Sequence, residues 1–124
     1  MNFPSDLRYT KEHEWIRIDG TNATVGITEF AQSELGDVIF VDVKSGATCA
    51  AGDSFGSIEA VKTVSDLYAP VACTIAEVNP MVNDNPELVN KDPYGDGWLV
   101  KVTLKDSAHE GLLSADDYRK LIGQ

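Results

Sequence analysis

Short stretches in which apolar and polar residues alternate predict a protein built mainly of β-strands. Residues 14–19 and 23–27 alternate in this way on either side of a turn at 20–22, so they predict an N-terminal hairpin. The same patterns predict further strands at residues 37–43, 54–58, 66–71, 74–79 and 98–104. Another short strand is predicted at 70–72, where it overlaps the end of the run at 66–71. Many short strands at this spacing are typical of an antiparallel sandwich or a flattened barrel.

Two segments follow a helical pattern instead. Thr28 is a suitable N-cap for a short helix over residues 29–35, and Gly36 is suited to end it. A C-terminal helix is predicted over residues 114–122, because acidic residues fill its first turn and basic residues come late. A single helical turn is predicted at residues 87–89. The residues expected to pack the C-terminal helix on the domain are Leu113, Tyr118, Leu121 and Ile122.

Lys62 stands at the centre of the most distinctive stretch. Apolar, strand-like runs lead into it and away from it, so the pattern predicts a hairpin whose turn presents Lys62 to solvent. Val61 and Val64 are expected to hold this turn against the protein. Glu59 lies three residues before the lysine and Asp66 four residues after it. From this pattern alone, an ordinary solvated lysine stays an open alternative.

The composition places the chain among ordinary globular proteins. Its 124 residues suit one domain, residues 1–124, and no apolar run approaches the length needed to cross a bilayer. The N-terminus has no basic region followed by an apolar one, and it is not rich in arginine. We therefore expect a bacterial cytoplasmic protein, or a mature form already stripped of a targeting segment.

The charge and the scarce cysteines and histidines restrict the chemistry further. Twenty acidic against ten basic residues give a net charge of −10, which disfavours nucleic-acid binding and favours basic protein partners. Cys49 and Cys73 form no Cys-x-x-Cys motif and lie among small residues, so we expect buried, inert thiols. His13 and His109 are far apart in the sequence, which makes a zinc site improbable.

The lysine segment, residues 59–71, is one of several stretches that together form a recognisable pattern. The others are residues 9–15, 26–32, 35–38 and 92–99. In this order, and over essentially the whole chain, they resemble the H proteins of the glycine cleavage system. Residues 59–71 resemble the lipoylation region of that family.

The resemblance implies a lipoyl/biotinyl-like hammerhead fold with its core at roughly residues 23–104. It implies that Lys62 bears lipoic acid through an amide bond and that the chain is a non-catalytic, freely diffusing carrier, most simply a monomer. Such a carrier shuttles the aminomethyl group and reducing equivalents between glycine decarboxylase (P protein), aminomethyltransferase (T protein) and dihydrolipoamide dehydrogenase (L protein). A lipoyl ligase or octanoyltransferase would attach the cofactor.

The resemblance also suggests roles for residues around the lysine. Glu59 and Asp66 are expected to help the ligase or the partner enzymes recognise the turn. Glu14 is expected near a surface cleft that shelters the loaded arm, where a carboxylate could pair with the aminomethyl ammonium group. Independently of the resemblance, the alternation predicts that Trp15 points inward, and a lone histidine near the start of a strand, such as His13, is expected to make a local hydrogen bond.

Three other functions stay open. A lipoate-relay protein, which holds lipoyl for transfer to other enzymes, needs the same lysine turn. A biotinyl carrier would have the similar Glu-Ala-Met-Lys motif, but Val61 and Thr63 stand where its methionines would flank the lysine. An unmodified binding module with an acidic face would tolerate Lys62→Arg. The mass of Lys62-containing peptides separates the modified from the unmodified cases.

Overall fold

The structure is a computed structural model, and it describes residues 1–105 and 111–124. These residues form nine short strands and four short helices, labelled β1–β9 and α1–α4 in chain order. Among them, no helix is both long and apolar enough to cross a membrane. His109 lies outside the described residues.

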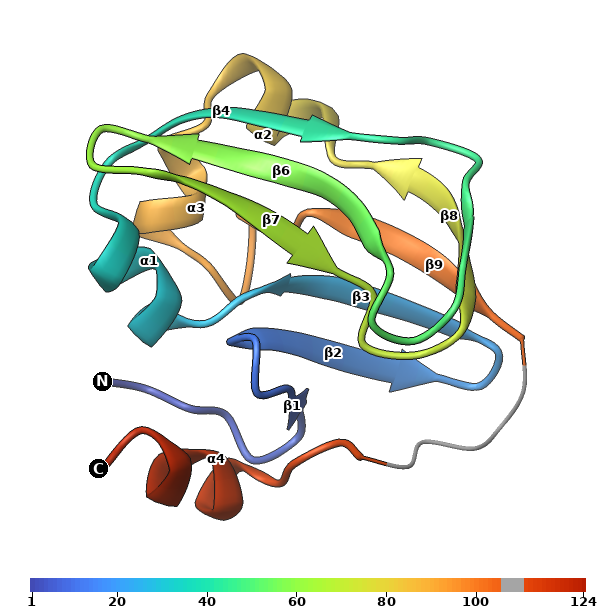
Figure 1. Cartoon of the computed structure of the whole chain (residues 1–124), viewed down its shortest axis with the longest axis horizontal. Helices are drawn as coiled ribbons and strands as arrows, with labels where there is room; N and C mark the ends of the chain where they lie inside the picture. Colours follow the sequence, from blue (N-terminus) through green and yellow to red (C-terminus); the bar gives the residue numbers. More distant parts are fainter. Residues whose placement is uncertain (106–110) are drawn as a thin grey trace.

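The strands form two antiparallel sheets, one behind and below the other in Figure 1. The larger sheet has the spatial order β1 (Arg8–Tyr9), β2 (Glu14–Asp19), β3 (Asn22–Ile27), β9 (Val100–Leu104), β8 (Cys73–Val78) and β5 (Thr48–Cys49). The smaller sheet has the order β4 (Val38–Val43), β6 (Ser54–Ala60) and β7 (Val64–Tyr68). The predicted fold class, mainly β with an antiparallel sandwich and an added N-terminal hairpin, is confirmed.

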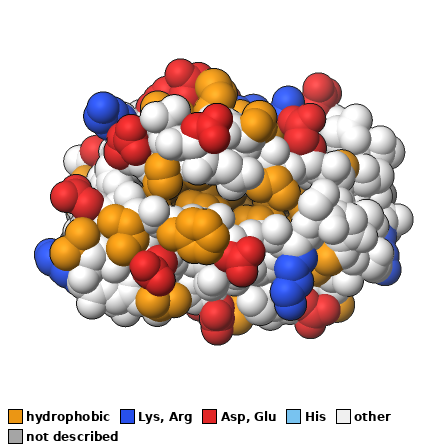
Figure 2. Space-filling model, turned by 90° about the horizontal axis from the view of Figure 1, so that it is seen from above, with side chains coloured by type: hydrophobic (Ala, Val, Ile, Leu, Met, Phe, Trp, Pro, Cys, Tyr) orange, Lys and Arg blue, Asp and Glu red, His pale blue; other side chains and the backbone are white. Residues whose placement is uncertain are grey.

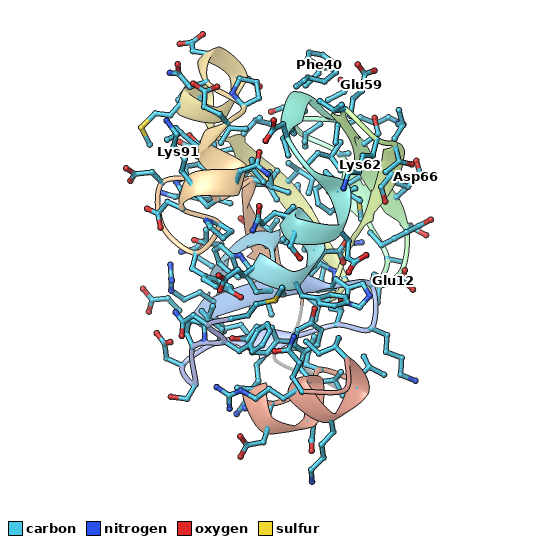
Figure 3. The ribbon with its side chains drawn as sticks, turned by 90° about the vertical axis from the view of Figure 1, so that its left-hand side faces the viewer. Glu12, Phe40, Glu59, Lys62, Asp66 and Lys91 are labelled. Atoms are coloured by element: carbon cyan, nitrogen blue, oxygen red, sulfur yellow. The ribbon has the colours of Figure 1, made fainter. Side chains whose placement is uncertain are left out.

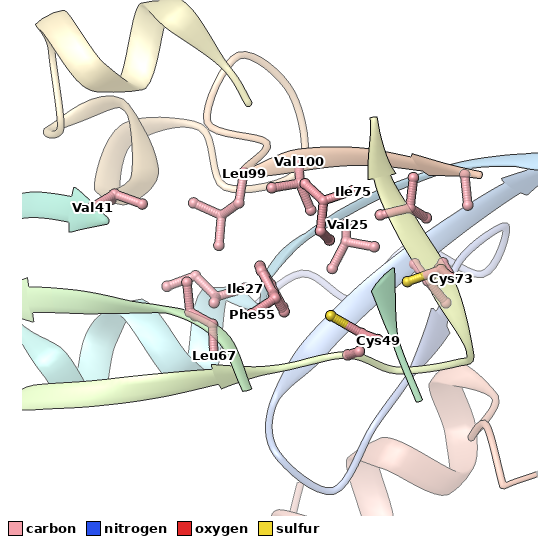
Figure 4. Close-up of a cluster of buried hydrophobic side chains, with 14 of the residues drawn as sticks. Val25, Ile27, Val41, Cys49, Phe55, Leu67, Cys73, Ile75, Leu99 and Val100 are labelled. Atoms are coloured by element: carbon pink, nitrogen blue, oxygen red, sulfur yellow. The ribbon is translucent and has the colours of Figure 1, made fainter. Parts of the chain in front are cut away.

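The main hydrophobic core lies between these two sheets. Along β9, Val100, Val102 and Leu104 are buried whereas Lys101 and Thr103 are exposed, because successive side chains of a strand point to opposite faces. Valine, isoleucine and phenylalanine from both sheets fill the space between them, as Figure 4 shows. Labelled examples are Val25 and Ile75 from the larger sheet and Val41, Phe55 and Leu67 from the smaller one.

Helix α1 (Glu29–Leu35) has the predicted boundaries. The Thr28 hydroxyl accepts a hydrogen bond from the amide of Ala31 at 3.1 Å, which caps the first turn. Gly36 ends the helix with φ of +79°, a conformation that residues with a Cβ rarely adopt. The helix therefore stops where the chain turns into β4.

Helices α2 (Pro80–Asp84) and α3 (Leu88–Lys91) connect β8 to β9. The fully buried Asn79 holds this connection together. Its side-chain oxygen accepts from the Met81 amide at the start of α2, and its amide group donates to the carbonyls of Asp96 and Trp98. The predicted single turn at residues 87–89 corresponds to α3, shifted by one or two residues.

Several element boundaries differ from the prediction. Residues 70–72 form a bend instead of a strand, and β9 begins at Val100, two residues later than predicted. Helix α2 was not predicted, although Asn79 followed by Pro80 is a typical helix start. The two-residue strands β1 and β5 were also missed, because so short a stretch has no detectable alternation.

A second hydrophobic cluster, which we call the aromatic cluster, joins the two chain ends beside the larger sheet. Its buried members are Phe3, Leu7, Tyr9, Trp15, Ala115 and Tyr118. The rings of Tyr9 and Tyr118 are stacked, with centroids 4.9 Å apart. Helix α4 (Ala115–Leu121) thus joins the domain, and Figure 1 shows it next to the N-terminal segment.

The predicted packing residues of α4 are correct with one exception. Tyr118 is fully buried, and Leu113 and Ile122 pack against the aromatic cluster while partly exposed. Leu121 is 48% exposed, so its predicted packing role is wrong. Leu121 is the last residue of α4 and is not among the residues that pack against the aromatic cluster.

Candidate functional site

Lys62 lies at the tip of the hairpin between β6 and β7. The Ala60 amide donates to the Thr63 carbonyl at 2.8 Å, which leaves Val61 and Lys62 as the two turn residues. Both residues are exposed. The aliphatic stem of Lys62 passes over Gly36, since a Cβ at Gly36 would lie 3.5 Å from the lysine Cδ and Cε. The structure thus presents Lys62 to solvent, as predicted, beside the end of α1.

The turn is held differently from the prediction. Val61 is 69% exposed and Val64 is 61% exposed, so neither holds the turn against the protein. Instead, the Val61 amide donates to the Asp37 carbonyl at 3.0 Å, which ties the turn to the segment that enters β4. Backbone hydrogen bonds therefore position the lysine, and the two valine side chains are left in solvent.

Glu59 and Asp66 flank the lysine on the two strands of the hairpin. Both are exposed, and they belong to different rows of the small sheet: Glu59 is paired with Val64, and Asp66 with Ser57. In Figure 3, Glu59 lies above Lys62 and Asp66 lies to one side of it. Asp66 also borders the cleft described next, whereas Glu59 does not.

A cleft of about 370 Å³ opens between α1, the start of β2 and the hairpin strands β6 and β7. Its apolar lining comes from both sheets and α1: Ile27, Phe30, Ala31, Leu35, Ile58 and Leu67. Its polar lining is His13, Ser65 and four acidic residues, Glu12, Glu14, Glu34 and Asp66. No lysine or arginine is among the lining residues. The cleft can therefore hold an apolar chain that ends in a positive charge.

Glu14 forms the floor of this cleft and is only 2% exposed. One carboxylate oxygen accepts from the Tyr68 amide at 2.7 Å, and the other accepts from the Thr10 hydroxyl at 3.3 Å. Burial raises the pKa of Glu14 to about 8, although the Tyr68 and Thr10 hydrogen bonds act in the opposite direction. The raised pKa favours the neutral carboxyl group near pH 7, and a cation beside it would favour the carboxylate.

His13 lines the cleft next to Glu14 and is held by a distant part of the chain. Its Nδ1 lies 2.8 Å from the Tyr118 hydroxyl, which lies 2.8 Å from the hydroxyl of Thr28. The His13 side chain thus bonds to a partner 105 residues away on α4, whereas the His13 backbone amide makes a local hydrogen bond, to the Thr10 carbonyl at 3.1 Å. Burial lowers the pKa of His13 even though Glu12 and Glu34 act to raise it, which favours the neutral imidazole.

Trp15 points inward as predicted and is fully buried. Its indole lies across Gly26 on the neighbouring strand: a Cβ at Gly26 would come within 2.7 Å of the ring. The indole nitrogen donates to the Pro93 carbonyl at 2.9 Å. Trp15 thus fixes the N-terminal hairpin of β2 and β3, from which His13 and Glu14 reach the cleft. Trp15 itself does not line the cleft.

Two cleft residues, Glu12 and Glu34, were not among the predicted site residues. Glu34 follows Phe30 by four positions on α1, so helical periodicity places both on the face that lines the cleft. Its position could have been predicted from that spacing. Glu12 lies near the other lining residues only because the start of β2 and the hairpin strands face each other across the cleft. No sequence signal indicates that these strands are neighbours.

No metal or redox centre is formed by the described residues. Within them, no three histidine, cysteine or acidic side chains group closely enough to hold a metal ion. Cys49 and Cys73 are paired across β5 and β8, are both buried and do not form a disulfide. Burial raises the pKa of the Cys73 thiol to about 11, which disfavours the reactive thiolate.

Comparison with known proteins gives one consistent result. The family described as Glycine cleavage H-protein matches residues 7–124. The glycine cleavage system H protein of Bacteroides thetaiotaomicron is 56% identical over 124 residues, covering 98% of both chains. That of Geobacillus kaustophilus is 51% identical over 126 residues, covering 100% of this chain and 99% of its own. The crystal structure of the glycine cleavage system H protein from Mycobacterium marinum superimposes with a TM-score of 0.90 at 43% identity, covering 98% of this chain and 100% of its own.

Proposed function

Because the chain belongs to the glycine cleavage H-protein family and acts as a lipoyl carrier in glycine cleavage, we propose that Lys62 is the residue that bears the lipoyl group. The supporting observation is the position of Lys62 at an exposed hairpin tip beside a cleft that is apolar on its walls and acidic at its polar positions. Lys62 does not line this cleft itself, but its stem lies at the end of α1, which does.

The residues present fit a lipoyl group. When bound, lipoyl supplies a disulfide-containing ring that accepts electrons and a one-carbon amine and is later reoxidised. Acylation of Lys62 removes its positive charge and lengthens a side chain that is already flexible. Ile27, Phe30 and Leu67 offer apolar contacts to such an arm in the cleft. The hairpin then needs only to hold Lys62 at its tip, and the backbone hydrogen bonds of the turn do so.

Glu14 is proposed to receive the charged end of the loaded arm. A buried carboxyl group whose pKa is about 8 gives up its proton readily when an ammonium group lies beside it, since the opposite charge favours the carboxylate. Glu12, Glu34 and Asp66 stand at the same cleft and add negative potential. The cleft is thus proposed to hold an aminomethyl-bearing arm more tightly than an arm with an uncharged end.

The chain is proposed to act as a carrier without catalysing a step. Glycine decarboxylase, aminomethyltransferase and dihydrolipoamide dehydrogenase would act in turn on the arm, and a lipoyl ligase or octanoyltransferase would attach it. Glu59 and Asp66 are proposed to mark the turn for these enzymes. The cytoplasmic location and the monomeric state predicted from the sequence stay predictions.

Intact mass measurement of protein from its native host, grown with glycine, tests this proposal. The expected result is a lipoyl mass increment that peptide mapping places on Lys62. The Lys62→Arg variant from the same host is the matched control, and it should show no lipoyl increment. A biotinyl increment would assign the chain to biotin carriers instead. An unmodified Lys62 in cells with an active lipoyl ligase would contradict the proposal and leave an acidic binding module.

A further inference from the structure

The outer face of the small sheet carries an unusual row of side chains next to Lys62. Strand pairing places Phe40 of β4 opposite Glu59 of β6, and Glu59 opposite Val64 of β7. Directly paired residues point to the same face of a sheet, with Cβ atoms about 5 Å apart. Val41 and Ile58, the neighbours along the strands, are buried, so alternation directs the row outward. We call Phe40, Glu59 and Val64 the outer row.

Two of the three outer-row residues are apolar, where a solvent-exposed sheet face is normally polar. Phe40 is 56% exposed and Val64 is 61% exposed. Ile39, at an irregularity in the β4–β6 pairing, and Val61, in the turn itself, add two more exposed apolar side chains. These four make up most of the large exposed hydrophobic residues in the described part of the chain; the others are Met1, Met81 and Leu121. Exposed hydrophobic residues gathered in one place indicate an interaction site, unlike scattered ones.

Acidic residues lie in this row and beside it. The next row of the sheet is Asp42, Ser57 and Asp66, and Glu59 lies at the centre of the outer row itself. Lys62 is the only basic residue in β4, β6, β7 or the turn between the last two. Figure 2, which views the molecule from the side of β4, shows hydrophobic side chains around a hollow with more acidic than basic side chains near them. A surface that fits this one combines apolar side chains, opposite Phe40 and Val64, with basic side chains, opposite Glu59 and the neighbouring acids.

We propose that the outer row is the docking surface for the enzyme that attaches the lipoyl group to Lys62, and that this enzyme presents apolar side chains together with lysine or arginine. This inference rests on the proposed function of Lys62. The other enzymes of the cycle meet a chain that already has its arm, which they can bind in their own active sites. The attaching enzyme meets the bare lysine, so its affinity must come from the protein surface next to that lysine.

Selection among the lysines gives a second reason. The chain has seven lysines, and all of them are exposed in the structure, so exposure alone cannot single out Lys62. Figure 3 shows Lys91 toward the left of the view, apart from Phe40, Glu59 and Lys62, which lie toward its upper right. Only Lys62 adjoins the outer row, and a large aromatic side chain such as Phe40 is the kind of residue that anchors a protein interface.

Attachment can be measured directly. The purified, unmodified chain is incubated with lipoate–protein ligase, lipoate and ATP. The amide forms when Lys62 Nζ attacks the acyl carbon of lipoyl adenylate; AMP leaves with the bonding electrons, and the amine proton passes to solvent. The mass gain on Lys62 against time and protein concentration gives kcat and KM. Phe40→Thr and Val64→Thr suit the test, because threonine is favoured in strands and both sites are exposed.

Phe40→Thr should lower kcat/KM about tenfold and Val64→Thr about threefold, mainly through KM, as expected for loss of an interface anchor and of its neighbour. Leu121→Ala is the matched control, since Leu121 is a 48% exposed apolar residue on α4, away from the lysine turn. Its rate should equal that of the wild type. Unchanged thermal unfolding temperatures for all three variants would show that folding does not explain the difference.

Three results would overturn the inference in distinguishable ways. Wild-type rates in both threonine variants would remove the outer row from recognition while leaving Lys62 as the lipoyl site. A wild-type dimer in sedimentation that Phe40→Thr dissociates would show that a second copy of the chain occupies the row. A reference lipoyl domain is included in the same tube. If that domain gains the lipoyl mass and the wild-type chain does not, the proposed function itself is overturned.

Discussion

The aromatic cluster and the outer row both contain large apolar side chains, but the fold treats them in opposite ways. Tyr118 and Tyr9 are fully buried and stacked on each other, and the hydroxyl of Tyr118 is hydrogen-bonded to His13 and Thr28. Phe40 and Val64 are more than half exposed. Burial of apolar surface stabilises a fold, whereas exposed apolar surface is available to a partner. The comparison assigns stability to one region and recognition to the other.

Lys62→Arg should produce the largest effect, a complete loss of lipoyl attachment. Arginine stays positively charged and cannot form the amide through a deprotonated amine. Because Lys62 is exposed, the free energy of unfolding should stay within about 0.5 kcal/mol of the wild type. Intact mass and urea unfolding check the two parts. A lipoyl increment on the variant would place the attachment site at another lysine.

Truncating one aromatic residue in each region tests the comparison most directly. Tyr118→Ala removes a fully buried ring and should cost about 3–5 kcal/mol of the free energy of unfolding. Phe40→Ala removes a ring that is 56% exposed and should cost about 1 kcal/mol or less. Urea unfolding of both variants gives the two values. Similar losses would mean that the outer row stabilises the fold as much as the aromatic cluster does.

Glu14→Gln should alter the pH dependence of stability. The pKa of Glu14 rises from an ordinary 4.5 to about 8 on folding, so the folded state holds a proton that the unfolded state has lost between these values. This contribution to stability is complete below pH 4.5 and is lost as pH rises through about 8. From pH 5 to pH 8 the wild type should therefore lose on the order of 3 kcal/mol more than the variant.

Urea unfolding of the wild type and Glu14→Gln at several pH values measures that difference. Glutamine keeps an oxygen that can accept from the Tyr68 amide but has no ionisable proton. Parallel pH profiles for the two proteins would show that the Glu14 carboxyl is ionised throughout this range. The proposed response of Glu14 to a cation in the cleft would then lose its basis.

Tyr118→Phe should cost about 1–2 kcal/mol of the free energy of unfolding, less than Tyr118→Ala, because the stacked ring stays and only the hydroxyl is lost. The buried Thr28 hydroxyl then lacks the partner it has across the cluster. NMR titration of His13 should show a changed pKa, since its Nδ1 loses the same hydroxyl. An unchanged His13 titration would mean that the aromatic cluster and the cleft are not connected through Tyr118.

Local patterns predicted the elements that have local causes. Helix α1 has its predicted limits because Thr28 caps one end and Gly36 ends the other, and both signals lie within a few residues of the helix. The hairpin that presents Lys62 was found for the same reason. The role of Val61 and Val64 was predicted wrongly, because burial depends on what covers a strand from elsewhere in the chain.

The sequence by itself determined the class of fold, the exposed lysine turn and the acids on either side of it, since alternation, caps and turn residues act between near neighbours. Only the tertiary structure decided that Glu14 is buried beneath a cleft shared with Asp66, that His13 bonds to Tyr118 across 105 residues, and that Phe40 stands beside Glu59. These contacts depend on the pairing and packing of distant strands. Cooperative burial of the core decides that pairing, and no short stretch of residues contains it.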